Sequence, residues 1–568
     1  INLRVGFYVS WLEPETNLAV EPSDNKKKTL HHNMLLYIWV AALVAAVYLY
    51  CRQVYSRFSK YGVKNMKPVP LLGNMSSILF RTRHFMEFLE DLYNEFPEER
   101  FVGNFEFVRP FLLIRDIQLI KQITVKDFEY FLDHRVLISD EVDPFFGRNL
   151  LSLKGQEWKD MRSTLSPAFT SSKMKLMLPF MVEVGDQMII SLKKQLKESK
   201  TGYIDIDTKE LTSHYANDVI ATCAFGLKVD SHAHPDNEFY KMGYKASNFG
   251  FSALLKFIGY SSFPSLMKLL KVNLFSDDVK NFFQHLVLST MKDRETHNIL
   301  RPDMIHLLME AKKGRLSHED NSIKDADAGF ATVEESTVGK KTVNRVWADI
   351  DLIAQAVLFF MAGFETISTA MTFLMYELAL HPEVQDKLAQ EIREHENKSG
   401  GKFDYNSIQT MTYMDMVVSE ILRLWPPAIG TDRVCLKDYN MGRPNDKATQ
   451  DFIMRKGECI SVPVAAIHRD PQYFPDPKKF DPERFSNENK HKIQPFTYLP
   501  FGLGPRNCIG SRFALCEVKV MVYQLLQHME LSPCERTPIP CQLAKDNFNL
   551  RIKGGHWLRL RPRALNDD

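Results

Sequence analysis

The chain has 568 residues, 45% of them hydrophobic and 25% charged, which is enough apolar material for a large buried core. Its formal net charge of +2 gives no reason to expect a nucleic acid as a partner. The eight cysteines are scattered and form no Cys-x-x-Cys pair. This spacing argues against zinc and against a disulfide framework, so we expect a reducing compartment.

The N-terminal part contains an apolar segment, residues 34–51, that is long enough to cross a bilayer as a helix. A buried core helix is the alternative, but such helices usually carry a polar stripe, which this segment lacks. Basic residues between positions 52 and 67 follow it directly, which places the rest of the chain in the cytoplasm. Three lysines at residues 26–28 oppose that orientation.

We therefore divide the chain into four parts. Residues 1–33 are a leader to which we assign no function; Met34 would be a natural start, so the leader need not belong to the native protein. Residues 34–51 are the transmembrane anchor, residues 52–75 a basic, proline-rich hinge, and residues 76–568 the main domain.

Two segments in the first half of the main domain can bind ligands or membrane. Trp158 and Arg162 lie four residues apart, so the indole N–H and the guanidinium share one helix face that suits a carboxylate. By itself this pair is a weak signal. Residues 257–264 are apolar and lie between Lys256 and Lys268. They read as a loop dipping into a membrane surface, which favours lipophilic substrates.

From residue 182 onward the pattern is mainly helical, with short strand-like runs between residues 451 and 465 and near the C-terminus. This predicts a mainly α fold with small β-sheets. Residues 312–341 form a polar, acidic tract that we interpret as an exposed loop between two helices.

The longest apolar helix pattern covers residues 349–380 and is closed by a His-Pro dipeptide. It contains Gly363 and Thr366, and a glycine inside a helix costs about 1 kcal/mol relative to alanine. The Thr366 hydroxyl can turn back to the carbonyl of Ala362 and open the helix locally. A core helix with a harmless glycine and a capping threonine is the structural alternative.

Glu420 and Arg423 place opposite charges three residues apart in an otherwise apolar helix pattern. Such a pair is usually solvated and of small value. If it were buried, it would lock the fold, because removing one partner would strand a charge at a cost of roughly 3–5 kcal/mol.

Residues 501–510, with the sequence FGLGPRNCIG, are the most informative stretch. Cys508 precedes an apolar helix pattern, and the positive end of a helix dipole favours a thiolate. A thiolate on a tight loop is how a protein offers sulfur as an axial ligand to haem iron. Arg506 can pair with a haem carboxylate, Phe501 can shield the sulfur, and Gly510, like Gly504, permits close approach of the macrocycle. The alternative is a buried structural cysteine.

This loop matches the F-x-x-G-x-R-x-C-x-G motif of the cytochrome P450 superfamily, and the chain resembles that family over roughly residues 66–560. Residues 362–366, AGFET, are similar to its oxygen-activating motif, which implies that Glu365 and Thr366 relay protons to bound oxygen. The resemblance also assigns haem propionates to Trp158, Arg162, Arg433, Arg506 and His134. It adds Arg484 to Glu420 and Arg423 as a structural cluster.

What the resemblance implies is a cytochrome P450 fold behind an N-terminal transmembrane helix, with residues 76–568 as the haem-thiolate catalytic domain. Haem b (iron protoporphyrin IX) would be bound by Cys508. The expected activity is that of a monooxygenase, which inserts one oxygen atom from O2 into lipophilic substrates. No dinucleotide-binding fingerprint follows a strand, so electrons must come from a separate NADPH-dependent cytochrome P450 reductase of the endoplasmic reticulum, with cytochrome b5 as a further partner.

Loop residues 166–173 are similar to the insect microsomal branch of the family, which implies xenobiotic metabolism by analogy. Four phenylalanines are candidates for the substrate cavity: Phe249, Phe251, Phe359 and Phe364. Six basic residues around the cysteine loop can dock an acidic electron donor: Lys478, Lys479, Lys490, Lys492, Arg512 and Lys519.

Two other functions stay open at this point. One is a haem-thiolate isomerase or dehydratase that rearranges peroxides without a reductase. The other is a haem-binding sensor or carrier without turnover. The presence of both Glu365 and Thr366 argues against each of them.

Overall fold

The computed structural model describes residues 24–135, 138–248, 250–313, 329–333, 336, 338–339, 345–400 and 404–563. The chain divides into two units, Ile1–Val54 and Tyr55–Asp568. Helices make up most of the second unit, and its described strands form three small sheets. The prediction of a mainly α fold with small β-sheets is therefore confirmed.

The N-terminal helix α1 (Asp24–Ser59) contains the predicted anchor, residues 34–51, whose side chains are mostly exposed. Among the described residues, two helices are long and apolar enough to cross a membrane, His31–Ser59 and Asp349–Leu380. The second is mostly buried in the core, which leaves α1 as the candidate anchor. The predicted hinge begins inside α1, because residues 52–59 are helical. Residues 1–23 of the leader lie outside the described residues.

The largest sheet joins two distant parts of the chain. Its order is β1 (Phe101–Glu106), β2 (Arg109–Ile114), β7 (Cys459–Val462) and β4 (Thr431–Val434). The pair β2–β7 is parallel and the other two pairs are antiparallel. The first two strands were not predicted. The sheet places β4, which carries Arg433, beside β7, which lies within the strand-like run predicted for residues 451–465.

Two smaller sheets contain the other strands. The order of one is β3 (Ile204–Asp207), β9 (Trp557–Pro562), β8 (Met529–Ser532), and the other pairs β5 (Tyr439–Asn440) with β6 (Ile453–Met454). The strand-like runs predicted near residues 451–465 and at the C-terminus correspond to β6, β7, β8 and β9.

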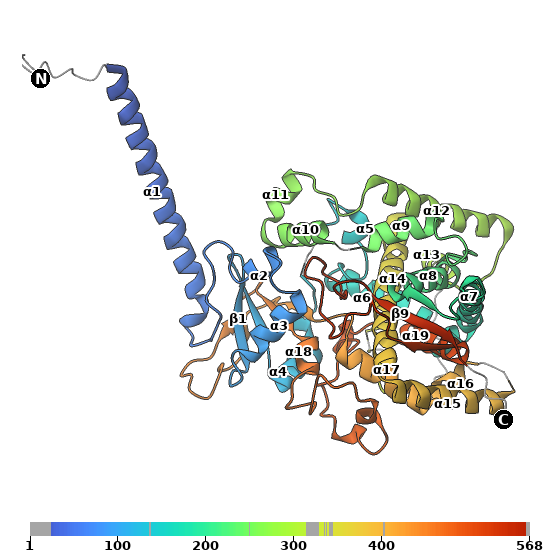
Figure 1. Ribbon diagram of the computed structural model, residues 1–568. Helices are drawn as coiled ribbons and strands as arrows, with labels where there is room; N and C mark the ends of the chain where they lie inside the picture. Colours follow the sequence, from blue (N-terminus) through green and yellow to red (C-terminus); the bar gives the residue numbers. More distant parts are fainter. Residues whose placement is uncertain are drawn as a thin grey trace, which may run out of the picture. The chain divides into compact units, whose positions relative to one another are not determined.

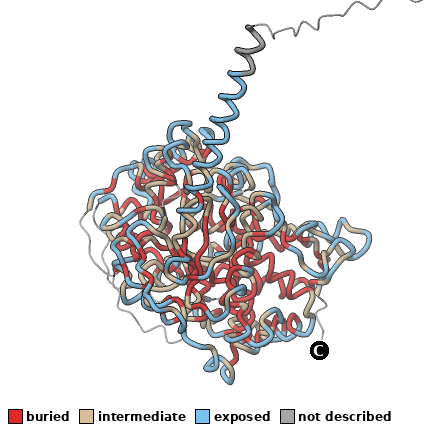
Figure 2. Tube along the Cα trace, turned by 90° about the vertical axis from the view of Figure 1, so that its left-hand side faces the viewer, coloured by how far each residue is buried: buried red, intermediate tan, exposed pale blue. Residues whose placement is uncertain are grey.

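Helix α14 (Asp349–Leu380) runs through the core and ends before Pro382, as predicted, because a proline disfavours helical backbone at the residue before it. It packs against α8 (Thr208–Ile220) and α19 (Ser511–His528), and Figure 1 shows it in yellow with α8 beside it. Figure 2 shows the buried trace gathered in the interior of the main unit.

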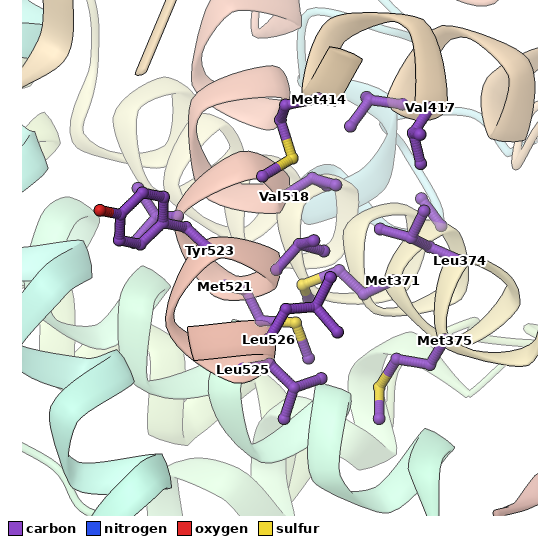
Figure 3. Close-up of a cluster of buried hydrophobic side chains, with 14 of the residues drawn as sticks. Met371, Leu374, Met375, Met414, Val417, Val518, Met521, Tyr523, Leu525 and Leu526 are labelled. Carbon is purple, nitrogen blue, oxygen red and sulfur yellow. The ribbon is translucent and has the colours of Figure 1, made fainter. Parts of the chain in front are cut away.

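One apolar cluster joins α14 and α19 to α7 (Ser171–Glu198) and α17 (Thr412–Leu424). In Figure 3, Met371 and Met375 of α14 lie near Met521 and Leu525 of α19. These side chains are buried, and large-to-small changes at such positions typically cost 2–5 kcal/mol. Helix α14, which carries Thr366, and helix α19, which follows Cys508, are thus held in one core.

The remaining α-helices complete the main unit. They are α2 (Ser76–Leu79), α3 (Phe85–Asn94), α4 (Ile117–Lys121), α5 (Pro144–Gly147), α6 (Gly155–Leu165), α9 (Glu238–Ser247), α10 (Phe251–Ser262), α11 (Pro264–Leu269), α12 (Asp277–His297), α13 (Met304–Lys312), α15 (Pro382–Ser399), α16 (Tyr405–Thr410) and α18 (Val464–His468).

Two predicted loops differ in the structure. Residues 257–264 are helical rather than a loop, since α10 and α11 cover almost all of them. Most of residues 312–341 lies outside the described residues, but the described piece 329–333 is anchored: Ala331 is buried, and the Phe330 N–H donates to Asp415 at 2.9 Å. That piece is therefore not an exposed loop.

Candidate active site

A cavity of about 520 Å³ lies between α6, α14 and the loop before α19. Its lining is mostly apolar, with charged side chains on one wall. The cavity brings together seven residues predicted from the sequence: Trp158, Arg162, Thr366, Phe501, Arg506, Cys508 and Gly510. His134 also lines it, whereas Glu365 and Arg433 do not belong to its lining. Parts of four distant segments thus meet at one space.

The loop of residues 501–510 presents Cys508 to this cavity. The Cys508 backbone N–H donates to the Phe501 carbonyl at 2.8 Å, which closes the loop, and α19 begins three residues later. The Cys508 side chain is exposed and not packed in the core, so the alternative of a buried structural cysteine does not hold.

Gly504 and Gly510 of this loop have different surroundings. Gly504 has a positive φ of 72°, and a Cβ there would lie 1.9 Å from the Thr124 carbonyl oxygen. Its close approach is therefore to protein backbone, contrary to the expectation that it admits the macrocycle. A Cβ on Gly510 would meet only Phe169, at 3.7 Å, so this position is open toward the cavity.

One wall of the cavity region is rich in buried guanidinium groups. Arg162 donates to the Asn507 carbonyl at 2.7 Å and to the Asn507 side chain at 2.8 Å. Arg506 donates to the Leu132 and Leu153 carbonyls, both at 2.8 Å, and stacks 4.0 Å from the Trp158 ring. These contacts fix the orientation of each guanidinium group, because an arginine with several acceptors has one favourable orientation.

The positive charge on this wall exceeds the nearby negative charge. Burial lowers the pKa of Arg433 to about 10, and Asp432 alone opposes that shift. Burial and the neighbouring Arg433 lower the pKa of Arg506 well below its ordinary value. Asp133 is 3.6 Å from Arg506, and Asp432 already accepts from His134 and the Arg135 backbone.

This surplus fits a ligand with two carboxylates, because buried cations are stable only when paired. A thiol exposed to an apolar cavity and arginines on the edge of that cavity are the donor set that a haem needs. The residues present therefore fit haem b.

On the other side of the cavity, α14 contributes Ala362, Gly363 and Thr366. The Thr366 hydroxyl donates to the Ala362 carbonyl at 2.6 Å, as predicted, and the Thr366 side chain is exposed to the cavity. The helix nevertheless continues without a break from Asp349 to Leu380. The predicted opening is thus limited to this one hydroxyl contact.

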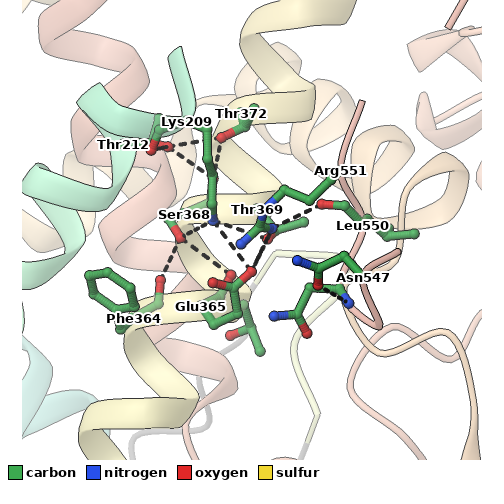
Figure 4. A network of polar contacts seen from close by, with 12 residues as sticks. Lys209, Thr212, Phe364, Glu365, Ser368, Thr369, Thr372, Asn547, Leu550 and Arg551 are labelled. Atoms are coloured by element: carbon green, nitrogen blue, oxygen red, sulfur yellow. Dashed lines mark hydrogen bonds and ion pairs between the residues drawn. The ribbon is translucent and has the colours of Figure 1, made fainter. Parts of the chain in front are cut away.

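Glu365 points away from the cavity lining and enters a buried polar network, drawn in Figure 4. Its carboxylate lies 2.6 Å from Arg551 and 3.5 Å from Lys209, and it accepts from the Thr369 hydroxyl at 3.1 Å. Burial alone would raise the pKa of Glu365, but Lys209 and Arg551 together bring it below its usual value. Glu365 is therefore an ionised carboxylate within a network of cations.

Lys209 and Arg551 were not found by the sequence reasoning, and no local pattern marks them. Lys209 lies on α8, where its ammonium donates to Ser368 at 2.6 Å. Burial lowers the pKa of Lys209 to about 7, although the attraction of Glu365 opposes the shift. A group with this pKa exchanges protons readily at neutral pH.

The pair Glu420–Arg423 is fully buried, and the Arg423 guanidinium donates to the two Glu420 carboxylate oxygens at 2.6 and 2.8 Å. Arg423 also donates to the carbonyls of His468 and Pro477, each at 2.8 Å. Arg484 reaches Glu420 at 3.4 Å. The three residues thus form a cluster, and none of them lines the cavity.

Some other predicted residues lie elsewhere. Of the four phenylalanines, Phe359 lines the cavity, Phe251 and Phe364 do not, and Phe249 lies outside the described residues. Phe364 instead stacks on Phe360 at 5.5 Å. Lys519 cannot dock a partner protein, because its side chain is buried and pairs with Asp415 at 3.0 Å.

Comparison with known proteins agrees with this geometry. The family model described as Cytochrome P450 matches residues 63–559. The chain is 46% identical to cytochrome P450 9e2 of Blattella germanica, over 93% of this chain and 98% of that protein. It is 38% identical to cytochrome P450 9c1 of Drosophila melanogaster, over 93% and 99%. It is 37% identical to cytochrome P450 6k1 of Blattella germanica, over 91% and 95%.

Such a match over nearly the whole chain confirms the predicted fold, the haem-thiolate cofactor and the enzyme class. The chain belongs to the cytochrome P450 family and is a haem-thiolate monooxygenase.

Proposed function

We propose that this monooxygenase oxidises lipophilic organic compounds, foreign compounds among them, with electrons passed from NADPH by a separate reductase. The observation that carries the proposal is the apolar cavity between Cys508 and Thr366. Apart from the charged wall, its side chains include Ile220, Leu358 and Phe359, which bury apolar surface and offer few hydrogen bonds.

Within this proposal, Cys508 would bind haem iron through its sulfur, with Phe501 and Gly510 beside it. Trp158, Arg162, Arg433 and Arg506 hold the two propionates. When bound, haem supplies the activation of O2 and the oxidation of the substrate C–H bond. The loop before α19 keeps the sulfur at one position because its backbone is closed by the Cys508–Phe501 hydrogen bond.

Proton supply is assigned to Thr366 and Glu365. The Thr366 hydroxyl is the group of the pair that is exposed to the cavity, and it can hold a proton there. Glu365 is the next residue on α14, and its carboxylate contacts Lys209. Burial lowers the pKa of Lys209 to about 7, so it exchanges protons near neutral pH, and the Glu365 carboxylate, after rotation of its side chain, orients the proton route toward Thr366.

The layout of the chain follows the four parts named above. Residues 34–51 anchor the protein in the endoplasmic reticulum membrane, residues 52–75 link the anchor to the body, and residues 76–568 form the catalytic domain on the cytoplasmic side. Exposed leucines on and after α11 (Leu266, Leu269 and Leu270) support contact of this segment with membrane lipid. Exposed lysines near the cysteine loop, with Lys519 excluded, support docking of the reductase and of cytochrome b5.

Reconstitution tests the proposed substrate class and electron source. The holoprotein in lipid vesicles with an NADPH-dependent flavoprotein reductase is incubated with a library of lipophilic compounds under isotopically labelled O2. We expect NADPH consumption to rise with a subset of compounds, and one labelled oxygen atom to appear in each product. Turnover of peroxides without reductase would instead support an isomerase or dehydratase. Oxygen consumption that no compound stimulates would support a sensor or carrier.

Thr366→Ala is expected to uncouple the reaction in the same assay. Product formed per NADPH falls about tenfold or more and hydrogen peroxide rises, since positioned proton donors contribute about 10²–10⁴-fold. Peroxide release and NADPH oxidation are measured together. Thr366→Ser keeps a hydroxyl at this position and is the matched control, with coupling close to that of the unsubstituted protein. Equal coupling in the alanine variant would remove Thr366 from the proton route.

A further inference from the structure

A second cavity of about 690 Å³ lies outside the one that contains Cys508. It is bordered by β2 and β7 on one side and by residues of α10 and α11, among them Tyr260 and Lys268, on the other. The edge-on contact of Phe263 with Phe107, at 5.7 Å, shows that the α10–α11 junction lies against the turn between β1 and β2. The second cavity therefore lies next to the segment proposed to meet the membrane.

Arg135 is the one described residue that lines both cavities. Its backbone N–H donates to the Asp432 carboxylate at 2.7 Å, which ties this residue to β4. Its guanidinium forms an ion pair with Glu106, the last residue of β1. Because the Arg135 backbone N–H is anchored, the side chain is the part of this residue that can move and connect the two cavities.

The Arg135–Glu106 pair is built differently from the structural pair Glu420–Arg423. The side chains of Arg135 and Glu106 are 26% and 13% exposed, whereas both members of the structural pair are fully buried. In addition, the Arg135 Nε–H is buried and has no acceptor among the described residues. A partly exposed pair with a spare donor separates at lower cost than a buried, fully satisfied one.

We propose that the Arg135–Glu106 ion pair is a gate between the outer cavity and the haem cavity. Bulky organic molecules enter the outer cavity, whose lining combines charged side chains with apolar ones such as Phe111 and Tyr260, and they pass inward when Arg135 leaves Glu106. The Nε–H of Arg135 offers a hydrogen bond to an acceptor on the passing molecule or to water. This inference rests on the proposed position of haem at Cys508, and it concerns the rate of access rather than the chemical step.

Rates of ligand binding test the gate in the holoenzyme. Glu106→Gln preserves the shape of the side chain and removes the ion pair. Binding of 4-phenylimidazole to the oxidised holoenzyme is followed by stopped-flow absorbance, and binding of carbon monoxide to the reduced holoenzyme serves as the small probe. We expect the association and dissociation rates of 4-phenylimidazole to rise together by about fivefold, or about 1 kcal/mol at 1.4 kcal/mol per tenfold. Its Kd and the carbon monoxide rates stay within about twofold.

The controls separate a gate from a structural role. Asp205→Asn removes a similar pair, Arg559–Asp205 at 2.7 Å, which touches neither of these two cavities, and it should leave all four rates unchanged. The exchange Glu106→Arg with Arg135→Glu restores an ion pair and should return the 4-phenylimidazole rates toward their original values.

Unchanged 4-phenylimidazole rates in both Glu106→Gln and Arg135→Met would overturn the gate. So would a change in dissociation alone, since that indicates direct contact with the bound ligand. If the unsubstituted reduced protein lacks the red-shifted carbon monoxide band, the proposed haem position is wrong instead, and this outcome is independent of the gate.

Discussion

Replacing Cys508 with alanine is expected to abolish the red-shifted carbon monoxide band of the reduced protein and all NADPH-dependent oxidation. The Cys508 side chain is the thiol that the loop exposes at the start of α19, on the side opposite Thr366. In the proposed assignment this thiolate would hold haem iron and supply electron density to it, which a methyl group cannot do. Difference absorbance spectra and the reconstituted assay measure the two losses.

Cys516→Ala is the matched control, because Cys516 lies on the same helix and is fully buried in the apolar core. Burial raises the pKa of its thiol to about 12, so it stays neutral. This variant should keep the band and most of the activity. A band of unchanged position in Cys508→Ala would refute the assignment of the axial ligand.

Arg423→Met is expected to destabilise the folded protein by about 3–5 kcal/mol, because the buried Glu420 carboxylate loses its two short contacts and keeps Arg484 only at 3.4 Å. Both side chains are fully buried, and Arg423 also donates hydrogen bonds to the carbonyls of His468 and Pro477. His468 in turn accepts from the Leu499 N–H at 2.7 Å, just before the cysteine loop. The loss should therefore also lower haem content, measured beside the urea midpoint.

Arg559→Met provides the comparison, since its partner Asp205 is 31% exposed and such pairs contribute about 0–1 kcal/mol. Arg484→Met should fall between the two, because Arg484 is 3.4 Å from Glu420 and 12% exposed. If Arg423→Met does not fold, the double change Glu420→Gln with Arg423→Met removes the stranded charge and should recover folded protein. Equal midpoints for Arg423→Met and Arg559→Met would show that the cluster does not lock the fold.

Most of the fold class and the centre of the site were predictable from the sequence, because they depend on residues close together in the chain. The loop of residues 501–510 contains Cys508, the turn that presents it and the N-cap residue of the following helix within ten positions. Thr366 and Ala362 are one helical turn apart, so their hydrogen bond followed from helix geometry alone. The 349–380 helix ended where the following proline required it.

Other features were not predictable because they depend on which distant segments pack together. Strands β1 and β2 pair locally with each other, but β2 joins the four-stranded sheet by pairing with β7, which lies far along the chain. Lys519 reads as a surface lysine in the sequence, yet α17 supplies Asp415 and buries it. Spacing along the chain does not report the desolvation that decides such cases.

The sequence by itself determined that Cys508 lies on a loop just before a helix and that Glu420 pairs with Arg423. It also determined that the Thr366 hydroxyl donates to the Ala362 carbonyl of the same helix. Each depends on backbone geometry over a few residues. The tertiary structure alone decided that Glu365 turns away from the cavity toward Lys209 and Arg551, and that Arg135 lies between two cavities. Burial and charge at these places come from elements far apart in the chain, and only packing brings them within a few ångströms.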